Sequence, residues 1–204
     1  MRKPRDERAG FHHVVTRGNN KQAIFLDDRD RRVFMLLLDR AATRHNWQIL
    51  CHALMRNHYH FVLRVLEGGL ARGMRDLNGV YALYFNGEHG RTNHLFGRRY
   101  WSELTETDEH LRNAIRYVVQ NPRRAGVPGP LASHPWTSYA ASIGKGFGPS
   151  RFARDELLRL FGPTPATAVP AFIAFCEEPA PPRQVPGGPG ECQVPPQNAR
   201  VRVT

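Results

Sequence analysis

The first side chains that could do chemistry are two histidines in the run His58-Tyr59-His60. The segment has strand character, and side chains two residues apart on a strand point to the same face. Two imidazoles roughly 7 Å apart along a strand can converge on one cation. The same pattern occurs more often as polar surface or as satisfied core. The Asp-His and HExxH sequences typical of metallohydrolases do not accompany it.

A tyrosine, Tyr117, is the second candidate, because a phenol oxygen can act as a nucleophile. It lies in a segment with helical periodicity, roughly 110° from the centre of the apolar stripe. Asn121 follows one turn later and could supply an oxygen ligand to a cation shared with His58 and His60, with Gln120 as the substitute. The competing interpretation is an amphipathic tyrosine where a helix meets a sheet.

The elements that must position these residues alternate between strands and helices. Asp27 or Asp28 is expected to cap the first helix and Thr107 the third, while Pro122 ends the third. The patterns predict strands at Phe11–Arg17, Trp47–Met55, His58–Val65 and His94–Leu104, and helices from Asp27 or Asp28 to His45, from Leu70 to Asn86-Gly87, and from Thr107 to before Pro122. This order predicts an α+β fold, an antiparallel sheet with helices packed on it.

Three parts of the chain are expected. Residues 1–145 form the main domain, and residues 146–178 form a short helical extension broken at Gly162-Pro163. Residues 179–204 are predicted to be a flexible tail, because residues 179–196 include 7 Pro and 3 Gly.

The charge of the chain favours a polyanionic partner. The net charge is +11, and residues 1–145 carry 23 Lys and Arg against 13 Asp and Glu. The positive field therefore belongs to the main domain, where nucleic acid would bind, although general solubility is the simpler explanation. Three widely spaced cysteines argue against a disulfide scaffold and a cysteine zinc site. With no membrane-length apolar run and no signal peptide, the expected location is the reducing cytoplasm.

A family resemblance joins these separate signals. The run MRNHYHFVLRV, preceded by GNNKQAIFLDDRDRRVF and followed by HLFGRRY, LRNAIRYVVQNPRRAG and HPWTSYAAS, resembles the REP-associated tyrosine transposases, single-tyrosine members of the HUH superfamily. The likeness covers about residues 10–145. It implies a ferredoxin-like or RRM-like fold with the histidines on the central sheet and the tyrosine on a facing helix.

The resemblance also implies roles for individual residues. His58, His60 and Asn121 would hold a divalent metal, Mg²⁺ or Mn²⁺, and Tyr117 would attack single-stranded DNA beside a hairpin. Two residues depart from the family pattern: Arg56 stands where proline is usual, and Tyr59 where an aliphatic residue is usual. Tyr59 therefore has to find a hydrogen bond or stay near an edge.

The remaining expectations concern the DNA and the alternatives. The candidate DNA contacts are basic or aromatic side chains that suit phosphate binding and base stacking: Arg17, Arg98, Arg99, Trp101, Arg116, Arg123 and Arg124. The protein would act at the nucleoid as a monomer or homodimer. Two alternatives stay open: a non-catalytic hairpin-binding regulator on the same fold, and a metal-dependent hydrolase that uses activated water.

Overall fold

The computed structural model describes residues 7–179, and its centre is one four-stranded antiparallel sheet. The strands are β1 (Gly10–Arg17), β2 (Trp47–Met55), β3 (His58–Val65) and β4 (Trp101–Thr105). Their order across the sheet is β2-β3-β1-β4. With one helix between β1 and β2 and another between β3 and β4, this is the predicted ferredoxin-like arrangement.

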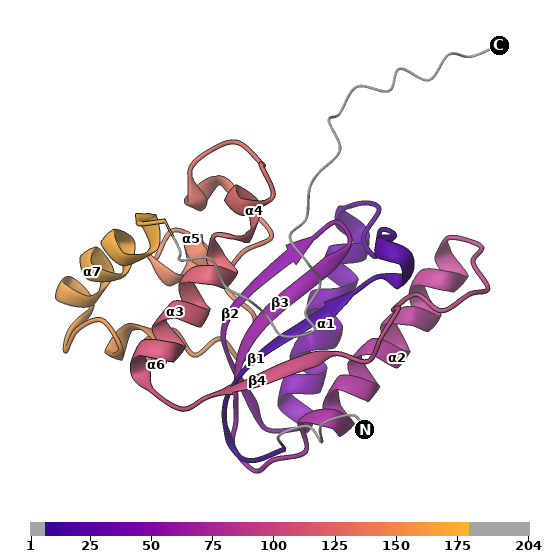
Figure 1. Ribbon diagram of the computed structural model, residues 1–204, viewed down its shortest axis with the longest axis horizontal. Coiled ribbons are helices and arrows are strands. Elements are labelled where there is room, and N and C mark those ends of the chain that lie inside the picture. Colours follow the sequence, from indigo (N-terminus) through magenta and orange to yellow (C-terminus); the bar gives the residue numbers. More distant parts are fainter. Residues whose placement is uncertain (1–6, 180–204) are drawn as a thin grey trace.

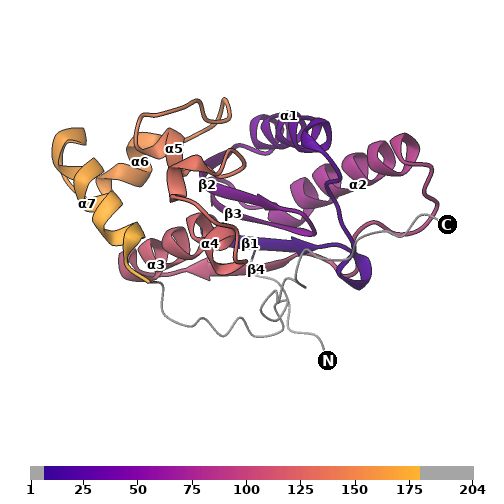
Figure 2. The same ribbon diagram turned by 90° about the horizontal axis from the view of Figure 1, so that it is seen from above.

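Helices cover both faces of this sheet (Figures 1 and 2). On one face lie α1 (Asp28–Arg44) and α2 (Leu70–Glu88), and on the other lies α3 (Asp108–Val119). The remaining helical segments are η1 (Asn19–Lys21), α4 (Asn121–Arg124), η2 (Leu131–Ser133), α5 (Tyr139–Ser142), α6 (Arg154–Arg159) and α7 (Pro165–Glu177). The α+β prediction is confirmed, including the helices near the C-terminus.

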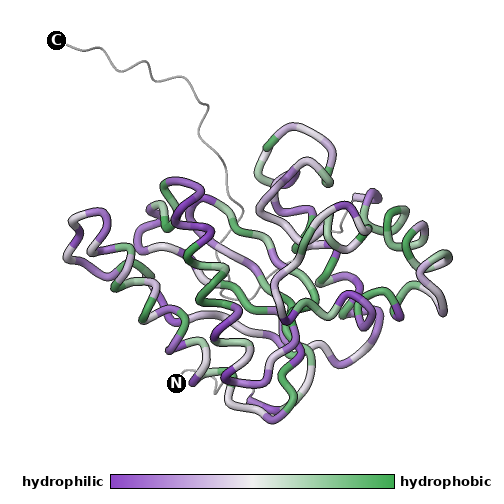
Figure 3. The backbone as a smooth tube through the Cα atoms, turned by 180° about the vertical axis from the view of Figure 1, so that it is seen from behind, coloured by the Kyte–Doolittle hydropathy of each residue, from purple (hydrophilic) through white to green (hydrophobic). Residues whose placement is uncertain are grey.

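The alternation of side chains along β3 separates two cores. Tyr59, Phe61 and Leu63 face α1 and α2 and belong to one buried apolar cluster. Val62, on the opposite face, belongs to a second cluster with residues of α3, α6 and α7. Figure 3 shows hydrophobic stretches in the central strands and hydrophilic ones in many of the outer connections.

The two unusual residues of the β2–β3 hairpin are accommodated. The Tyr59 hydroxyl donates to Asn78 Oδ1 at 2.6 Å, so the buried phenol has the partner that it required. The carbonyl of Arg56 accepts hydrogen bonds from the backbone N–H groups of Ile24 and Phe25. The turn therefore forms without the proline that is usual before Asn57.

The helix caps follow the sequence. The side chain of Asp27 accepts from the backbone N–H of Asp30, and that of Thr107 accepts from His110. α3 ends at Val119, before Pro122, as predicted, but the chain then starts the short helix α4 at Asn121. A proline in the first turn of a helix is favourable, because its missing N–H has no partner there in any case.

The predicted strand over His94–Leu104 is wrong in its first half. Only Trp101–Thr105 is a strand, and the preceding segment touches the sheet through one bridge between Gly18 and Phe96. Leu95 is buried and Phe96 packs against the same apolar cluster. These side chains hold the segment to α2, which alternation in the sequence could not reveal.

The domain boundaries at residues 145 and 178 stay predictions. The helices after residue 150 break at Gly162-Pro163 as expected, between α6 and α7. The tail predicted at 179–204 lies outside the described residues, except for Pro179. In the described chain, no helix has both the length and the apolar character needed to cross a bilayer.

Candidate active site

The histidine pair lies on the sheet face that α3 covers. The rings of His58 and His60 are 5.0 Å apart between centroids and nearly perpendicular, with an interplanar angle of 82°. Both residues are almost fully buried. Burial, followed by the positive charge of Arg17, lowers the pKa of His58 to about 4. The imidazole is therefore neutral at pH 7 and keeps a lone pair on one nitrogen.

Asn121 reaches the same point from the other side. Its Oδ1 lies 3.3 Å from His58 Nε2, and its Nδ2 donates to the carbonyl of Tyr117 at 3.1 Å. The second bond orients the amide so that its oxygen faces the imidazole. Gln120, the substitute candidate, points elsewhere: its Nε2 donates to the carbonyls of Cys176 and Glu178 at the end of α7.

Tyr117 stands beside this group, half-buried on α3. Its ring centroid is 5.5 Å from that of His60. The guanidinium of Arg124 lies over the ring, 4.9 Å from its centroid. The fold therefore gathers the four residues singled out in the sequence, His58, His60, Tyr117 and Asn121, around one point.

A third histidine, His13, belongs to the site, although no pattern in the sequence singled it out. Its Nε2 lies 3.2 Å from His60 Nδ1, and the two rings are stacked with centroids 5.4 Å apart. It also meets the ring of Tyr117 at 5.8 Å and that of Trp101 at 5.4 Å. The His12-His13 pair was visible in the sequence, but which of the two faces the site depends on the pairing of β1 with β3. That pairing sets Val15 opposite His60, so His13 is its diagonal neighbour.

The candidate ligands His58 and His60 suit a small divalent cation if the amide oxygen of Asn121 is a third ligand. Within residues 7–179, no three His, Cys, Asp or Glu side chains are grouped so that they could hold a metal ion. The oxygen of Asn121 lies 3.3 Å from His58 Nε2, and the ring of His60 lies beside that of His58. Imidazole and amide oxygen are both ligands of first-row divalent metals, and a bound phosphate can complete the shell.

The proposed DNA contacts fall into three places. Arg17, Trp101 and Arg124 adjoin the site. Arg116 and Arg123 face α7 instead, where they pair with Glu178 and Glu177. The guanidinium of Arg116 also stacks over Phe175, at 4.1 Å from the ring centroid.

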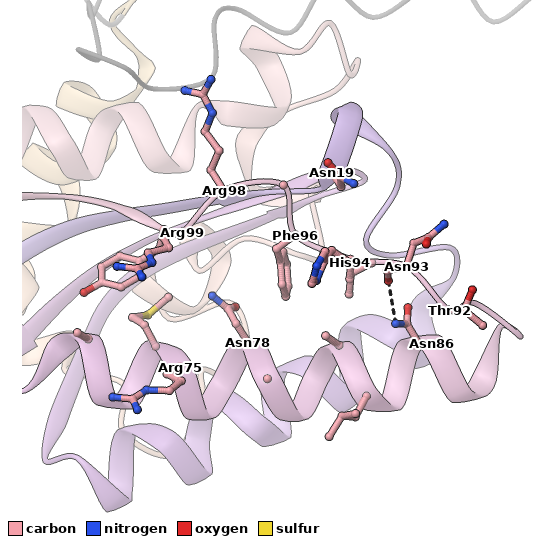
Figure 4. A pocket seen from close by; sticks show the side chains of 18 residues that line it. Asn19, Arg75, Asn78, Asn86, Thr92, Asn93, His94, Phe96, Arg98 and Arg99 are labelled. Atoms are coloured by element: carbon pink, nitrogen blue, oxygen red, sulfur yellow. Dashed lines mark hydrogen bonds between the residues drawn. The ribbon is translucent and has the colours of Figure 1, made fainter. Parts of the chain in front are cut away.

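Arg98 and Arg99 lie at an open cleft between α2 and the segment that leads into β4 (Figure 4). Arg75, Asn78 and Phe96 are among its other lining residues, and no acidic side chain lines it. Asn78 and Phe96 point into the space, whereas Arg98 points away from α2. The cleft is joined to the site through the chain itself, because only Tyr100 separates Arg99 from Trp101.

The chain is similar to known proteins in sequence and in fold. The family described as "Transposase IS200 like" matches residues 10–121. Among solved structures, a REP-associated tyrosine transposase bound to a REP hairpin is similar at a TM-score of 0.60 and 14% identity, over 75% of this chain and 91% of that one. A Deinococcus radiodurans protein assigned as a transposase is similar at a TM-score of 0.42 and 17% identity, over 59% of this chain and 97% of that one. No curated protein sequence matches.

Proposed function

The chain belongs to the IS200-like transposase family, and we propose that it cuts and rejoins single-stranded DNA with Tyr117 as the nucleophile. The observation that carries the proposal is the contact of Tyr117, on α3, with the imidazoles of His60 on β3 and His13 on β1. Packing alone requires neither a half-buried phenol here nor imidazoles beside it. A strand-transfer reaction requires both kinds of group.

The chemistry assigned to Tyr117 is a transesterification. The phenol oxygen attacks the phosphorus, the bond from phosphorus to the 3′ oxygen breaks, and a 5′-phosphotyrosine forms. The phenolic proton is lost, and the departing oxygen becomes a 3′-hydroxyl when it gains a proton. Since the new ester keeps the bond energy, another 3′-hydroxyl can attack it and rejoin the strands without ATP.

We assign His58, His60 and Asn121 as the residues that would hold a divalent metal, Mg²⁺ or Mn²⁺. When bound, such an ion polarises a nonbridging phosphate oxygen and orients the scissile group. The neutral state of His58 supports the assignment, because a ligating imidazole must offer a lone pair. Burial of both rings keeps water away from the donors and strengthens their electrostatic interactions.

We propose a single strand that carries a hairpin as the substrate, on the nucleoid of the cytoplasm. The similar structure holds a REP hairpin, which is the closest support for this substrate class. Arg17, Trp101 and Arg124 would contact the strand at the site, and Arg98 and Arg99 would contact it along the cleft. At Arg116 and Arg123, DNA phosphates would compete with the carboxylates of Glu178 and Glu177.

One experiment separates this function from a hairpin-binding regulator and from a hydrolase. The protein is incubated with Mn²⁺ and labelled single-stranded hairpin DNA, and the products are run on a denaturing gel. A covalent adduct that mass spectrometry places on the Tyr117 peptide is the expected result. Free 5′-phosphate without an adduct would select the hydrolase, and binding without any product would select the regulator.

A further inference from the structure

The side chain of Asn57, at the tip of the β2–β3 hairpin, has both of its polar atoms engaged. Its Nδ2 donates to the carbonyl of Lys21 at 3.0 Å. Its Oδ1 lies 2.8 Å from Nδ1 of His58, the next residue. Because a carbonyl can only accept, the bond to Lys21 identifies the nitrogen end of the amide. The oxygen end therefore faces His58.

This orientation determines which nitrogen of His58 carries the proton. An amide oxygen is an acceptor, so His58 Nδ1 must be the donor. A neutral imidazole carries one N–H, and Nε2 is then left with a lone pair. Nε2 is the atom that faces Asn121.

The group opposite Nε2 is also an acceptor. Asn121 donates its Nδ2 to the Tyr117 carbonyl, so its Oδ1 is the atom 3.3 Å from the ring nitrogen. Two lone pairs thus face each other in a buried place, where neither can satisfy the other. A cation between or beside them can accept electron density from both, which is the requirement for a metal ligand pair.

The loop that presents the Lys21 carbonyl is held in an unfavourable conformation. Asn20 and Lys21 have φ values of 49° and 60°, in the left-handed region that residues with a Cβ disfavour. The adjacent Gly18 could not carry a Cβ, which would lie 2.1 Å from the carbonyl oxygen of Gln22. The N–H of Gly18 donates to the Asn57 carbonyl at 2.9 Å, so loop and hairpin tip are tied twice. Strain of this kind persists where the surroundings fix it, often beside functional sites.

From these contacts we infer that the Lys21 carbonyl and Asn57 form a positioning relay that holds His58 in the Nδ1–H tautomer and aims Nε2 at the metal. The inference rests on the proposed function for the identity of the cation, but not for the tautomer. Asn57 is a positioning residue, since it acts on the site only through His58. Partners of this kind commonly change metal affinity by roughly 10- to 100-fold when removed.

The test compares two substitutions at one position. Asn57→Leu removes both hydrogen bonds at similar volume, and Asn57→Asp restores the acceptor toward His58. The His58 tautomer is read from ¹⁵N NMR of the metal-free protein, with His58→Gln used to assign the signals. Mn²⁺ affinity is measured without DNA by isothermal titration calorimetry, and thermal unfolding in EDTA checks the fold.

We expect the Nδ1–H tautomer in the wild type and in Asn57→Asp. In Asn57→Leu we expect a mixture of tautomers, with Mn²⁺ affinity weakened roughly 10- to 100-fold. An Nε2–H tautomer in the wild type, or the same tautomer in the Leu variant as in the wild type, would overturn the relay. So would equal losses of affinity in the Leu and Asp variants. If Asn57→Leu does not fold, Asn57→Ala removes the same bonds without the bulk.

Failure of the proposed function would look different. If the wild type binds no Mn²⁺, the proposed metal site is wrong. If it forms no adduct with DNA, the proposed role of Tyr117 as nucleophile is wrong. The NMR comparison would still decide whether Asn57 sets the tautomer, because it needs neither metal nor DNA.

Discussion

The two faces of the sheet use the same strand for opposite purposes. Toward α1 and α2, Tyr59 joins an aromatic cluster in which Phe34 lies 4.8 Å from its ring and 4.9 Å from that of Tyr81. Toward α3, its neighbours His58 and His60 meet Tyr117 and Asn121. The first face is an apolar core in which the hydroxyls of Tyr59 and Tyr81 are hydrogen-bonded. The second face combines another apolar cluster with a group of polar side chains.

The difference shows why two tyrosines of similar appearance have different prospects as nucleophiles. Burial raises the pKa of Tyr59 well above its usual value, and its hydroxyl is bound to Asn78. Tyr117 is half-buried and stands among imidazoles and a guanidinium. A phenol that must lose its proton to react is therefore disfavoured on the first face.

The largest effect expected from this comparison is on cleavage. Tyr117→Phe removes one oxygen and almost no volume, so the protein should fold and bind its hairpin but form no adduct, a loss of roughly 10³-fold or more. Tyr59→Phe is the matched control, since it removes a phenol oxygen from the other face. It should cleave normally and lose about 1 kcal/mol of stability, because Asn78 is left without its donor. Gel assays and thermal unfolding measure the two outcomes, and normal cleavage by Tyr117→Phe would exclude the proposed chemistry.

The second prediction removes the proposed metal or one of its proposed ligands. His60→Ala, or EDTA added to the wild type, should abolish cleavage while hairpin binding survives, since the arginines that hold the phosphates remain. The measurements are cleavage on a denaturing gel and binding by fluorescence anisotropy. Full activity in EDTA would show that the histidines serve some purpose other than holding a metal.

The third prediction concerns acid stability and a histidine of the other face, His52 on β2. Burial lowers its pKa to about 4, against about 6.5 in an unfolded chain. As pH falls below 6.5 the unfolded state takes up a proton that the folded state refuses until about pH 4. The stabilisation is therefore complete above pH 6.5 and is lost between pH 6.5 and 4, by on the order of 3 kcal/mol.

Denaturant titrations in EDTA between pH 7 and 4 measure this loss. His58, with its pKa also lowered to about 4, adds a loss of the same sign. His52→Gln should therefore lose the part of the pH dependence that His52 causes and keep the part that His58 causes. An identical pH profile in wild type and variant would show that His52 is not the buried, neutral group described here.

The smallest expected effect is on the salt dependence of DNA binding. Affinity for hairpin DNA should fall steeply with salt, and Arg99→Ala should reduce the slope of log K against log salt by about 0.7, as loss of one single-strand phosphate contact requires. Arg29→Ala is the control, because Arg29 pairs with Glu88 on α2. Equal slopes for the wild type and Arg99→Ala would show that the DNA does not contact Arg99 in the cleft.

Local pattern in the sequence was sufficient for the elements that carry the site. The bounds predicted for the two strands of the β2–β3 hairpin, Trp47–Met55 and His58–Val65, are those of the structure. The apolar stripe on α3 is buried, and Tyr117 lies off it. These features follow from periods of two and about 3.6 residues, which depend only on neighbours in the chain.

What the tertiary structure alone decided are the contacts between distant segments. His13 joins the site because β1 pairs with β3 in one register, and a shift by one residue would bring His12 there instead. Asn121 rather than Gln120 faces His58 because α7 occupies the amide of Gln120, and the same helix pairs with Arg116 and Arg123. Asn57 is a partner of His58 because a strained loop places the Lys21 carbonyl beside it. Residue spacing sets the face on which a side chain emerges, but its partner across the fold depends on packing between segments that the spacing does not encode.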